Sequence, residues 1–191
     1  MEILEAILSR RSIRRYKSNP VEDEKLKVMW ESARLAPSGG NTQPWNFVIV
    51  RSDETRKQIV EACHRQNWML QAPVLLVCVA DIRTRIKEQE NIVLSETSPQ
   101  VELKKIIRDT AIAIEHLVLQ AESLGLSTCW VAYFEQEDIR PILSIPPDKY
   151  VVAVITVGYA DESPRARPRR SLEEIIHFET WQGRASFSRR Y

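Results

Sequence analysis

Arginine is the residue type in this sequence whose spacing first suggests a chemical role. Two groups of four stand near opposite ends of the chain: Arg10, Arg11, Arg14 and Arg15, and Arg165, Arg167, Arg169 and Arg170. The guanidinium group is a planar, permanently charged donor whose fork fits the oxygens of a phosphate. Either group alone is more simply a solvated run of charge. Two groups in a chain of net charge +1, with the hydroxyl of Ser12 inside the first, favour one compact phosphate ligand.

The second arginine group lies in a proline-containing stretch, SPRARPRRSLEE at 163–174. Proline stiffens such a stretch into an extended conformation, in which successive side chains point to opposite sides. We therefore expect only some of these arginines to face one ligand.

Another polar segment, APSGGNTQP at 36–44, separates an expected helix from an expected strand. Its short side chains, Ser38, Asn41 and Gln43, can hydrogen-bond carbonyl groups and ring nitrogens. Its two glycines allow a ligand to approach the backbone. By itself, however, the segment is better explained as an ordinary helix-to-strand connection.

Other classes of site lack their motifs. The chain has no G-x-G-x-x-G after a strand and no G-x-x-x-x-G-K-[ST], so neither a Rossmann dinucleotide site nor a P-loop is expected. Serine and cysteine lack any recognisable hydrolase signature. The histidines and cysteines are too dispersed for a zinc site or a disulfide framework: His64, His116, His177, Cys63, Cys78 and Cys129. Arginine side chains would therefore have to hold an anionic ligand.

The composition is that of a packed globular protein. Its 191 residues suit one domain, expected at 1–181, with a C-terminal arm or tail at 182–191. The net charge of +1 argues against nucleic acid as a partner. No apolar stretch approaches the roughly 20 residues that a membrane span needs, and no export signal is recognised. The expected location is the cytoplasm.

Helical and strand patterns alternate along the chain. Apolar spacing predicts helices at 3–8, 22–35, 53–65 and 101–124, and strands at 45–50, 72–81, 127–134 and 151–159. The strands at 72–81 and 151–159 are apolar throughout, which is typical of burial on both faces. The polar stretch 82–100 is interpreted as a surface excursion that could serve as a lid. Helices packed over a sheet, in an α/β or α+β sandwich, are the expected architecture.

The helix expected at 101–124 carries apolar residues beyond a single stripe. Such a helix is usually central in its own fold or buried against a second subunit. Gly125 is well placed to end it, because glycine readily adopts the left-handed conformation at a helix C-terminus.

Five segments, in order along nearly the whole chain, resemble the nitroreductase family of flavin-dependent oxidoreductases. They are ILSRRSIRRY at 7–16, APSGGNTQPWNFVIV at 36–50, ACHRQNWMLQAPVLLVCVAD at 62–81, GLSTCWVAYF at 125–134 and VGYADESPRARPRRSLEEIIHFETW at 157–181. Each alone is a weak signal, but five in this order are a strong one. The resemblance implies an α+β sandwich with a central, mostly antiparallel sheet flanked by helices. It also implies a homodimer with the long helix at its interface.

The resemblance further implies one FMN in each of two sites built across that interface. Contacts to the phosphate, ribityl chain and pyrimidine edge would come from Arg10, Arg11, Ser12 and Arg14. Arg167 and Arg169 would close on the phosphate, and Arg170 could replace either. The partner subunit would contribute Pro37, Ser38, Gly39 and Asn41. Gln66 would reach the polar edge of the ring, while Trp130, Ala132 and Tyr133 would lie along it, largely through backbone groups.

The activity implied is ping-pong. NAD(P)H would reduce the flavin and leave, and an electron-poor acceptor such as a nitroaromatic or a quinone would then be reduced at the same face. An acid–base pair is not required, because the cofactor carries the chemistry. A cation such as Arg14 at the pyrimidine edge would stabilise the charge that the reduced ring gains.

One position departs from the family pattern, and two other functions remain open. The family commonly has Gly-Ala where this chain has Ala132 and Tyr133, so the tyrosine ring could narrow the substrate pocket. The first alternative is a flavin-dependent specialist on the same fold, such as a dehalogenase or a ring-cleaving enzyme. The second is a non-enzymatic protein whose arginines bind nucleic acid or another phosphorylated ligand.

Overall fold

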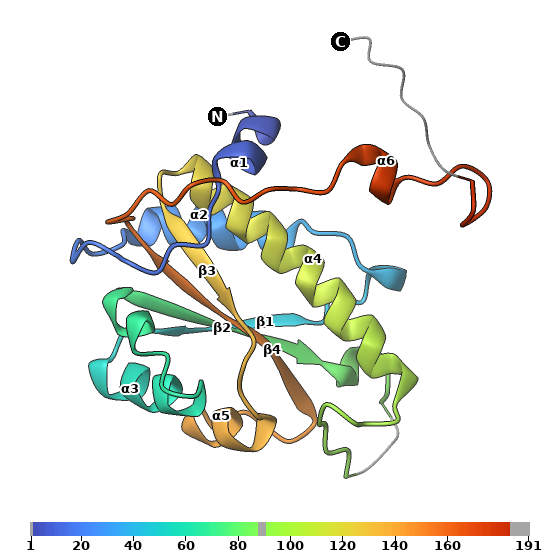
Figure 1. The fold of residues 1–191 in the computed structure, drawn as a ribbon. Helices are drawn as coiled ribbons and strands as arrows, with labels where there is room; N and C mark the ends of the chain where they lie inside the picture. The colour runs from blue at the N-terminus through green and yellow to red at the C-terminus, as the bar shows by residue number, and fades with distance from the viewer. Residues whose placement is uncertain (1, 88–90, 184–191) are drawn as a thin grey trace.

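Four antiparallel strands form the central sheet of the computed structural model, which describes residues 2–87 and 91–183. The strands are β1 (Trp45–Val50), β2 (Val74–Asp81), β3 (Ser127–Val131) and β4 (Lys149–Gly158), in the order β1-β2-β4-β3 (Figure 1). Each neighbouring pair is antiparallel. The expected α+β fold with a mostly antiparallel sheet is therefore confirmed.

Helices cover both faces of this sheet. They are α1 (Ile3–Ser9), α2 (Asp23–Arg34), α3 (Asp53–Ala62), α4 (Val101–Ser123), α5 (Gln136–Ile142) and α6 (Leu172–Ile175). Short 3₁₀ turns stand at η1 (Gly39–Asn41), η2 (Asn67–Gln71) and η3 (Ile82–Thr84). Helices α2 and α4 share one core with the sheet, and α3 and α5 share the other. The sequence patterns predicted α1 to α4 and all four strands within a few residues, but not α5 or α6.

Strand β2 shows why the sheet is buried on both faces. Leu76 and Cys78 point into the core under α2 and α4, while Leu75 and Val77 point into the core under α3 and α5. Because strand side chains alternate between faces, both sets must be apolar. The apolar run at 72–81 thus contains a strand that is buried on both faces, as predicted.

Helix α4 ends in a Schellman motif that fixes where β3 begins. Gly125 has a φ of 74°, and its N–H donates to the carbonyl of Glu122 at 3.0 Å. The N–H of Leu126 donates to the carbonyl of Ala121 at 2.9 Å. This pair of bonds is the arrangement that a left-handed C-terminal glycine permits. Strand β3 therefore leaves α4 in a defined direction.

The stretch 82–100 is only partly the surface excursion that was expected. Ile82, Ile92 and Leu94 are buried in the core under α4, and the N–H of Leu94 donates to the carbonyl of Pro147 at 2.9 Å. Three apolar side chains spaced without a regular period are enough to anchor the segment. The sequence pattern missed them because Ile92 and Leu94 belong to no regular element and Ile82 lies in a single 3₁₀ turn.

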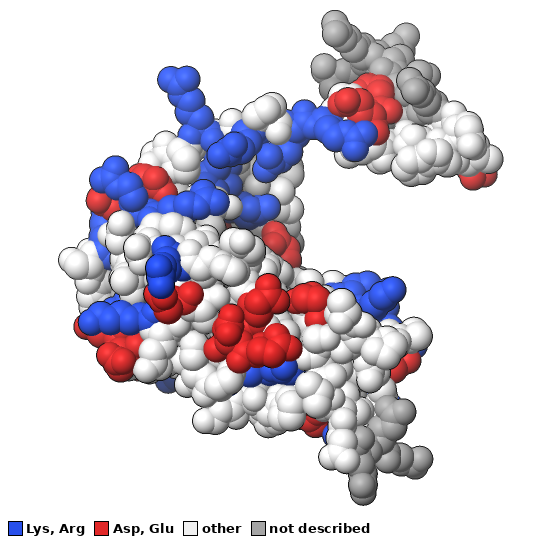
Figure 2. Space-filling view, turned by 60° about the horizontal axis from the view of Figure 1, so that its bottom comes forward, with Lys and Arg blue, Asp and Glu red and all other residues white. Residues whose placement is uncertain are grey.

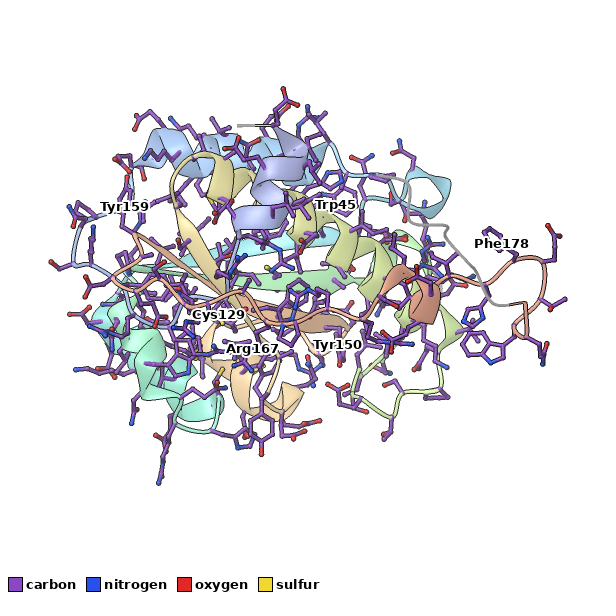
Figure 3. All side chains as sticks on the ribbon, turned by 45° about the horizontal axis from the view of Figure 1, so that its top comes forward. Trp45, Cys129, Tyr150, Tyr159, Arg167 and Phe178 are labelled. Atoms are coloured by element: carbon purple, nitrogen blue, oxygen red, sulfur yellow. The ribbon has the colours of Figure 1, made fainter. Side chains whose placement is uncertain are left out.

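The chain ends in an arm, residues 163–183, that leaves the body of the protein (Figure 1). Residues 163–175 are all exposed, and Phe178 lies on the part that extends away from the sheet and helices (Figure 3). Of the tail expected at 182–191, residues 184–191 lie outside the described part of the chain. Among the described residues, no helix is both long and apolar enough to span a membrane.

Candidate functional site: an arginine-lined cavity

The two arginine groups meet at one cavity of about 500 Å³, between the end of α1 and the beginning of the arm. Its walls are Ile7, Leu8, Arg10, Arg11, Ser12, Arg14, Pro164, Arg165, Ala166, Arg167 and Arg169. Figure 2 shows Lys and Arg side chains gathered where the arm leaves the body. No acidic side chain is among the described residues that line the cavity. Such an arrangement favours binding of an anion.

The second arginine group follows the expected alternation. Arg165, Arg167 and Arg169 line the cavity, as their spacing of two predicts for an extended segment. Arg170 instead turns toward α6, where its Nη2 donates to the carbonyl of Glu174 at 2.5 Å. Arg170 does not line the cavity, and its ability to replace Arg167 or Arg169 stays a prediction.

The first arginine group is held in place by two buried neighbours, Ile13 and Tyr16. The N–H of Ile13 donates to the carbonyl of Thr128 in β3 at 3.0 Å. The hydroxyl of Tyr16 donates to the carbonyl of Ile13 at 2.7 Å. Ile13 is buried between exposed Ser12 and Arg14, so these two polar residues project from the opposite side of the segment. Both line the cavity, and buried Tyr16 fixes the segment beyond them.

Glu162 also fixes this segment, and the sequence patterns did not identify it. Its Oε1 accepts hydrogen bonds from the backbone N–H of Arg14 at 2.5 Å and of Arg15 at 3.1 Å. Glu162 immediately precedes the arm, so the contact joins the two ends of the chain at the cavity. Because the carboxylate binds backbone amides, it orients the segment without taking the Arg14 guanidinium.

The arginines of the first group have different roles. Arg11 donates through Nη1 to the carbonyls of Leu8 and Arg10, both at 2.7 Å, and so satisfies the end of α1. Arg10 is 3.5 Å from the carboxylate of Glu115 in α4. The guanidinium carbon of Arg14 lies 5.6 Å from the centre of the Trp68 ring, a cation–π distance. The Trp68 ring therefore orients the Arg14 guanidinium.

Residues at the end of β3 and directly after it extend the site away from the cavity. Trp130 and Tyr133 are exposed, with 39% and 65% of their surface accessible. The Tyr133 ring stacks on His64, with ring centres 3.8 Å apart. Gln66 donates to the carbonyl of Cys63 at 3.2 Å. It lies between His64, which contacts Tyr133, and Trp68, which contacts Arg14.

The Pro37–Asn41 loop does not line the cavity. The N–H of Gly39 donates to Oδ2 of Asp109 in α4 at 3.2 Å. Asp109 stands six residues before Glu115, the partner of Arg10, which is about 9 Å along a helix axis. A single chain therefore keeps Pro37, Ser38, Gly39 and Asn41 apart from the arginines, and their expected place in a second subunit's site stays a prediction.

The cysteines near the site are not activated. Burial raises the pKa of the Cys129 thiol, against the opposing effect of the nearby Arg14 charge. Burial also raises the pKa of Cys63 to about 12. Both thiols therefore remain protonated at neutral pH, and thiolate chemistry has no support. The described residues contain no cluster of His, Cys, Asp and Glu that could hold a metal ion.

Comparison with known proteins identifies the family of this chain. Residues 7–159 match the nitroreductase family. The chain belongs to that family. A Thermus thermophilus protein named NADH dehydrogenase is 30% identical over 190 residues, covering 90% of this chain and 93% of that protein. The Bacillus subtilis protein named FMN reductase [NAD(P)H] is 27% identical over 185 residues, covering 94% and 74%.

A solved structure of B. megaterium NfrA2 has the same fold. It superposes with a TM-score of 0.84 at 28% identity, covering 95% of this chain and 76% of that one. As a member of the nitroreductase family, the chain thus has the fold that its five motifs predicted. His64, Trp68 and Glu162 were missed as site neighbours because each acts through a contact that sequence spacing does not reveal.

Proposed function

We propose that this nitroreductase-family protein is an FMN-dependent oxidoreductase that uses NAD(P)H to reduce electron-poor acceptors, such as nitroaromatics or quinones, by a ping-pong mechanism. The observation that carries this proposal is that both arginine groups line one cavity beside β3, whose described lining contains no acidic side chain. The names of the relatives, NADH dehydrogenase and FMN reductase [NAD(P)H], support the same reaction class.

The cavity suits the phosphate of FMN. A phosphate monoester carries close to two negative charges at pH 7 and three acceptor oxygens. Arg167 and Arg169 line the cavity together with Arg10 and Arg14, and Ser12 adds a hydroxyl group to the same lining. Arg11 would contribute its charge mainly, since its Nη1 is engaged by the end of α1. Arg165, which was not among the expected contacts, lines the same wall.

The residues beyond the cavity would orient the ring. Trp130 lies in β3, and Ala132 and Tyr133 directly follow this strand; all three are exposed. Gln66 precedes η2, which carries Trp68, the ring beside Arg14. When bound, FMN would supply the hydride-accepting ring. The protein would supply position, the positive charge of Arg14 at the pyrimidine edge, and exclusion of water by the apolar walls.

We propose that two copies of the chain assemble into a homodimer. Helix α1 exposes Ile3, Leu4 and Leu8, with 77%, 65% and 66% of their surface accessible. The arm exposes a second apolar set: Leu172, Ile175, Phe178 and Trp181. Exposed apolar side chains in such number mark an interaction surface. A second copy would cover them and bring its own Pro37–Asn41 loop to the site.

An absorbance spectrum of the purified protein, before and after anaerobic addition of NADH or NADPH, tests the proposal. Bound FMN should show flavin bands that bleach with at least one nucleotide and return when a quinone is added. A protein that remains colourless after incubation with FMN would refute the cofactor assignment. Bound flavin that neither nucleotide reduces would refute the proposed donor.

One observation favours a second candidate, a flavin-dependent specialist. The Tyr133 ring, stacked on His64, stands where the family commonly has a small residue, and it would reduce the space beside the expected position of the flavin ring. A narrow site favours a restricted set of acceptors. A comparison of kcat/KM across quinones and nitroaromatics of increasing size distinguishes the two candidates, because a general reductase should accept most of them.

A further inference from the structure

A buried ion pair fastens the Pro37–Asn41 loop to helix α4. Asp109 has only 3% of its surface exposed. Its Oδ2 accepts hydrogen bonds from the N–H of Gly39 at 3.2 Å and from Nη2 of Arg85 at 2.9 Å. The same Nη2 donates to the carbonyl of Gly39 at 2.9 Å. Both backbone polar groups of one loop residue are thus held by one charged pair.

Arg85 is itself fixed from several sides. Its side chain is 15% exposed, and its Nη1 lies 3.5 Å from Oε2 of Glu102. The N–H of Arg85 donates to the carbonyl of Ile82 at 2.9 Å, and Ile82 is fully buried at the end of β2. The guanidinium therefore connects α4 and the loop, while the backbone of Arg85 is held by the η3 turn. A planar group with several fixed donors is suited to this task, whereas a lysine amine is not.

Gly39 is matched to this guanidinium. A Cβ atom at this position would lie 2.8 Å from Nη2 of Arg85 and 3.7 Å from Oδ2 of Asp109. Any side chain would therefore displace the Arg85 guanidinium from the Gly39 carbonyl. Glycine is required at this position because the Arg85 guanidinium lies too close for a side chain.

The loop that the pair holds has an unfavourable backbone. Asn41 and Gln43 have positive φ angles of 55° and 47°, in the left-handed region that non-glycine residues seldom adopt. Ser38 Oγ accepts a hydrogen bond from the N–H of Gln43 at 2.9 Å, which closes the loop on itself. Such a conformation persists only where the surroundings determine it, and the pair is the charged part of those surroundings.

We propose that Arg85 and Asp109 are positioning residues for the flavin site of the other subunit. They fix Gly39 and thereby set where Ser38 and Asn41 meet the cofactor across the dimer interface. This inference rests on the proposed FMN function and deepens it. Removing one partner of a buried ion pair leaves the other charge unpaired and lowers stability, so the test must separate a loss of stability from a change in the loop.

The first test compares Arg85→Ala, Asp109→Asn and Arg85→Lys with an Arg83→Ala control. Arg83 lies in the η3 turn that Arg85 ends and pairs with Asp148 at 2.6 Å, so its loss removes a partly buried ion pair that does not contact the loop. Hydrogen exchange of residues 36–44 in the apo protein and the Kd for FMN are measured for each. The thermal unfolding midpoint of each apo protein is recorded, and the FMN titrations are carried out at temperatures well below it.

Arg85→Ala should speed amide exchange of the 36–44 segment and raise the Kd for FMN about tenfold, the scale of a charged hydrogen bond. Arg85→Lys should restore only part of the affinity, because the amine cannot contact Gly39, Asp109 and Glu102 together. Arg83→Ala should change neither readout. A role limited to stability would lower the unfolding midpoint and leave the Kd unchanged.

A mixed dimer tests whether the pair acts across the interface. One subunit carries Arg14→Ala and the other carries Arg85→Ala. If Arg85 acts on the other subunit's site, the site that lacks Arg14 also receives the loop that lacks Arg85. The other site then has both wild-type residues. FMN titration should then show one site of wild-type affinity per dimer. If Arg85 acts within its own chain, both sites are impaired.

The outcomes separate the two proposals. A wild-type protein that binds no FMN overturns the proposed function and the positioning role together. A wild-type protein that binds FMN, with Arg85→Ala and Asp109→Asn binding equally well, overturns the positioning role alone. Unchanged exchange of the 36–44 segment in both variants, or a mixed dimer without a wild-type site, also overturns it.

Discussion

The hydroxyl oxygen of Tyr16 lies 2.6 Å from Oγ1 of Thr156, and both groups are buried. Thr156 Oγ1 also accepts a hydrogen bond from the N–H of Cys129 at 3.1 Å. Tyr16 in turn donates to the carbonyl of Ile13. Two hydroxyl groups thus join the arginine segment to β3 and β4. The position of the cavity depends on this buried connection.

Tyr16→Phe should therefore destabilise the fold by about 1–3 kcal/mol, because it leaves the buried Ile13 carbonyl without its partner. Chemical denaturation measures the change. Tyr159→Phe is the matched control, since the Tyr159 hydroxyl contacts the exposed side chain of Glu22 and its loss should cost about 0.5 kcal/mol or less. Equal destabilisation by both substitutions would contradict the assigned role of Tyr16.

The same tyrosine predicts a loss of stability in alkali. Burial raises the pKa of Tyr16 above its ordinary value near 10. The unfolded chain therefore releases the phenol proton first, while the folded chain retains it, and stability falls as pH rises above 10. The slope from this one group approaches about 1.4 kcal/mol per pH unit. Unfolding curves between pH 9 and 11 should show a shallower decline for Tyr16→Phe than for the wild type.

Arg14 and Arg15 form a natural comparison for FMN binding. Arg14 lines the cavity, whereas the Arg15 guanidinium lies 3.6 Å from Asp161 and its side chain is 64% exposed. Arg14→Ala should raise the Kd for FMN roughly tenfold to a hundredfold, the range for a hydrogen bond to a charged group. Arg15→Ala should change it less than about twofold. Fluorescence titration of apo protein measures both, and similar weakening would show that charge alone matters.

The residues around the cavity also show which parts of the site can be predicted from the sequence. The alternation of Arg165, Arg167 and Arg169 was predictable, because proline imposes an extended backbone and a spacing of two. The contact between Glu162 and the Arg14 amide was not, because it joins residues 148 positions apart through backbone atoms. Local patterns report periodicity, whereas this contact depends on tertiary packing.

The contacts of the Pro37–Asn41 loop with distant residues could likewise not be predicted from the sequence. Its motif was recognised, but the sequence does not indicate that Arg85 from the 82–100 stretch would fasten it. That stretch lacks a regular period, so its buried residues and its one loop-binding arginine could not be distinguished from a solvated connection. The structure identifies them because it places three distant segments together.

Tyr133 should control which acceptors the enzyme reduces. Tyr133→Ala removes the ring that stacks on His64 and should raise kcat/KM for bulky quinones about two- to tenfold, the scale of an aromatic pair. Tyr133→Phe keeps the stack and should preserve the wild-type preference. Steady-state kinetics with a series of quinones measures the effect. An acceptor profile that is the same in all three proteins would show that the ring does not limit access.

Two truncations separate the apolar and cationic functions of the arm. A chain ending at residue 170 loses the exposed set Leu172, Ile175, Phe178 and Trp181 but keeps Arg165, Arg167 and Arg169. A chain ending at residue 162 loses both. Because each large apolar side chain contributes about 1.5–3 kcal/mol when fully buried, the first truncation should already weaken the dimer by several kcal/mol in sedimentation measurements.

The second truncation should reduce FMN affinity further at protein concentrations where dimer content is matched, because it also removes three cavity-lining guanidinium groups. Equal FMN affinity in the two truncated chains would contradict the assignment of those arginines to the phosphate. An undiminished dimer in the chain ending at 170 would instead show that the arm's apolar residues pack elsewhere, and would leave α1 as the surface that holds the two subunits together.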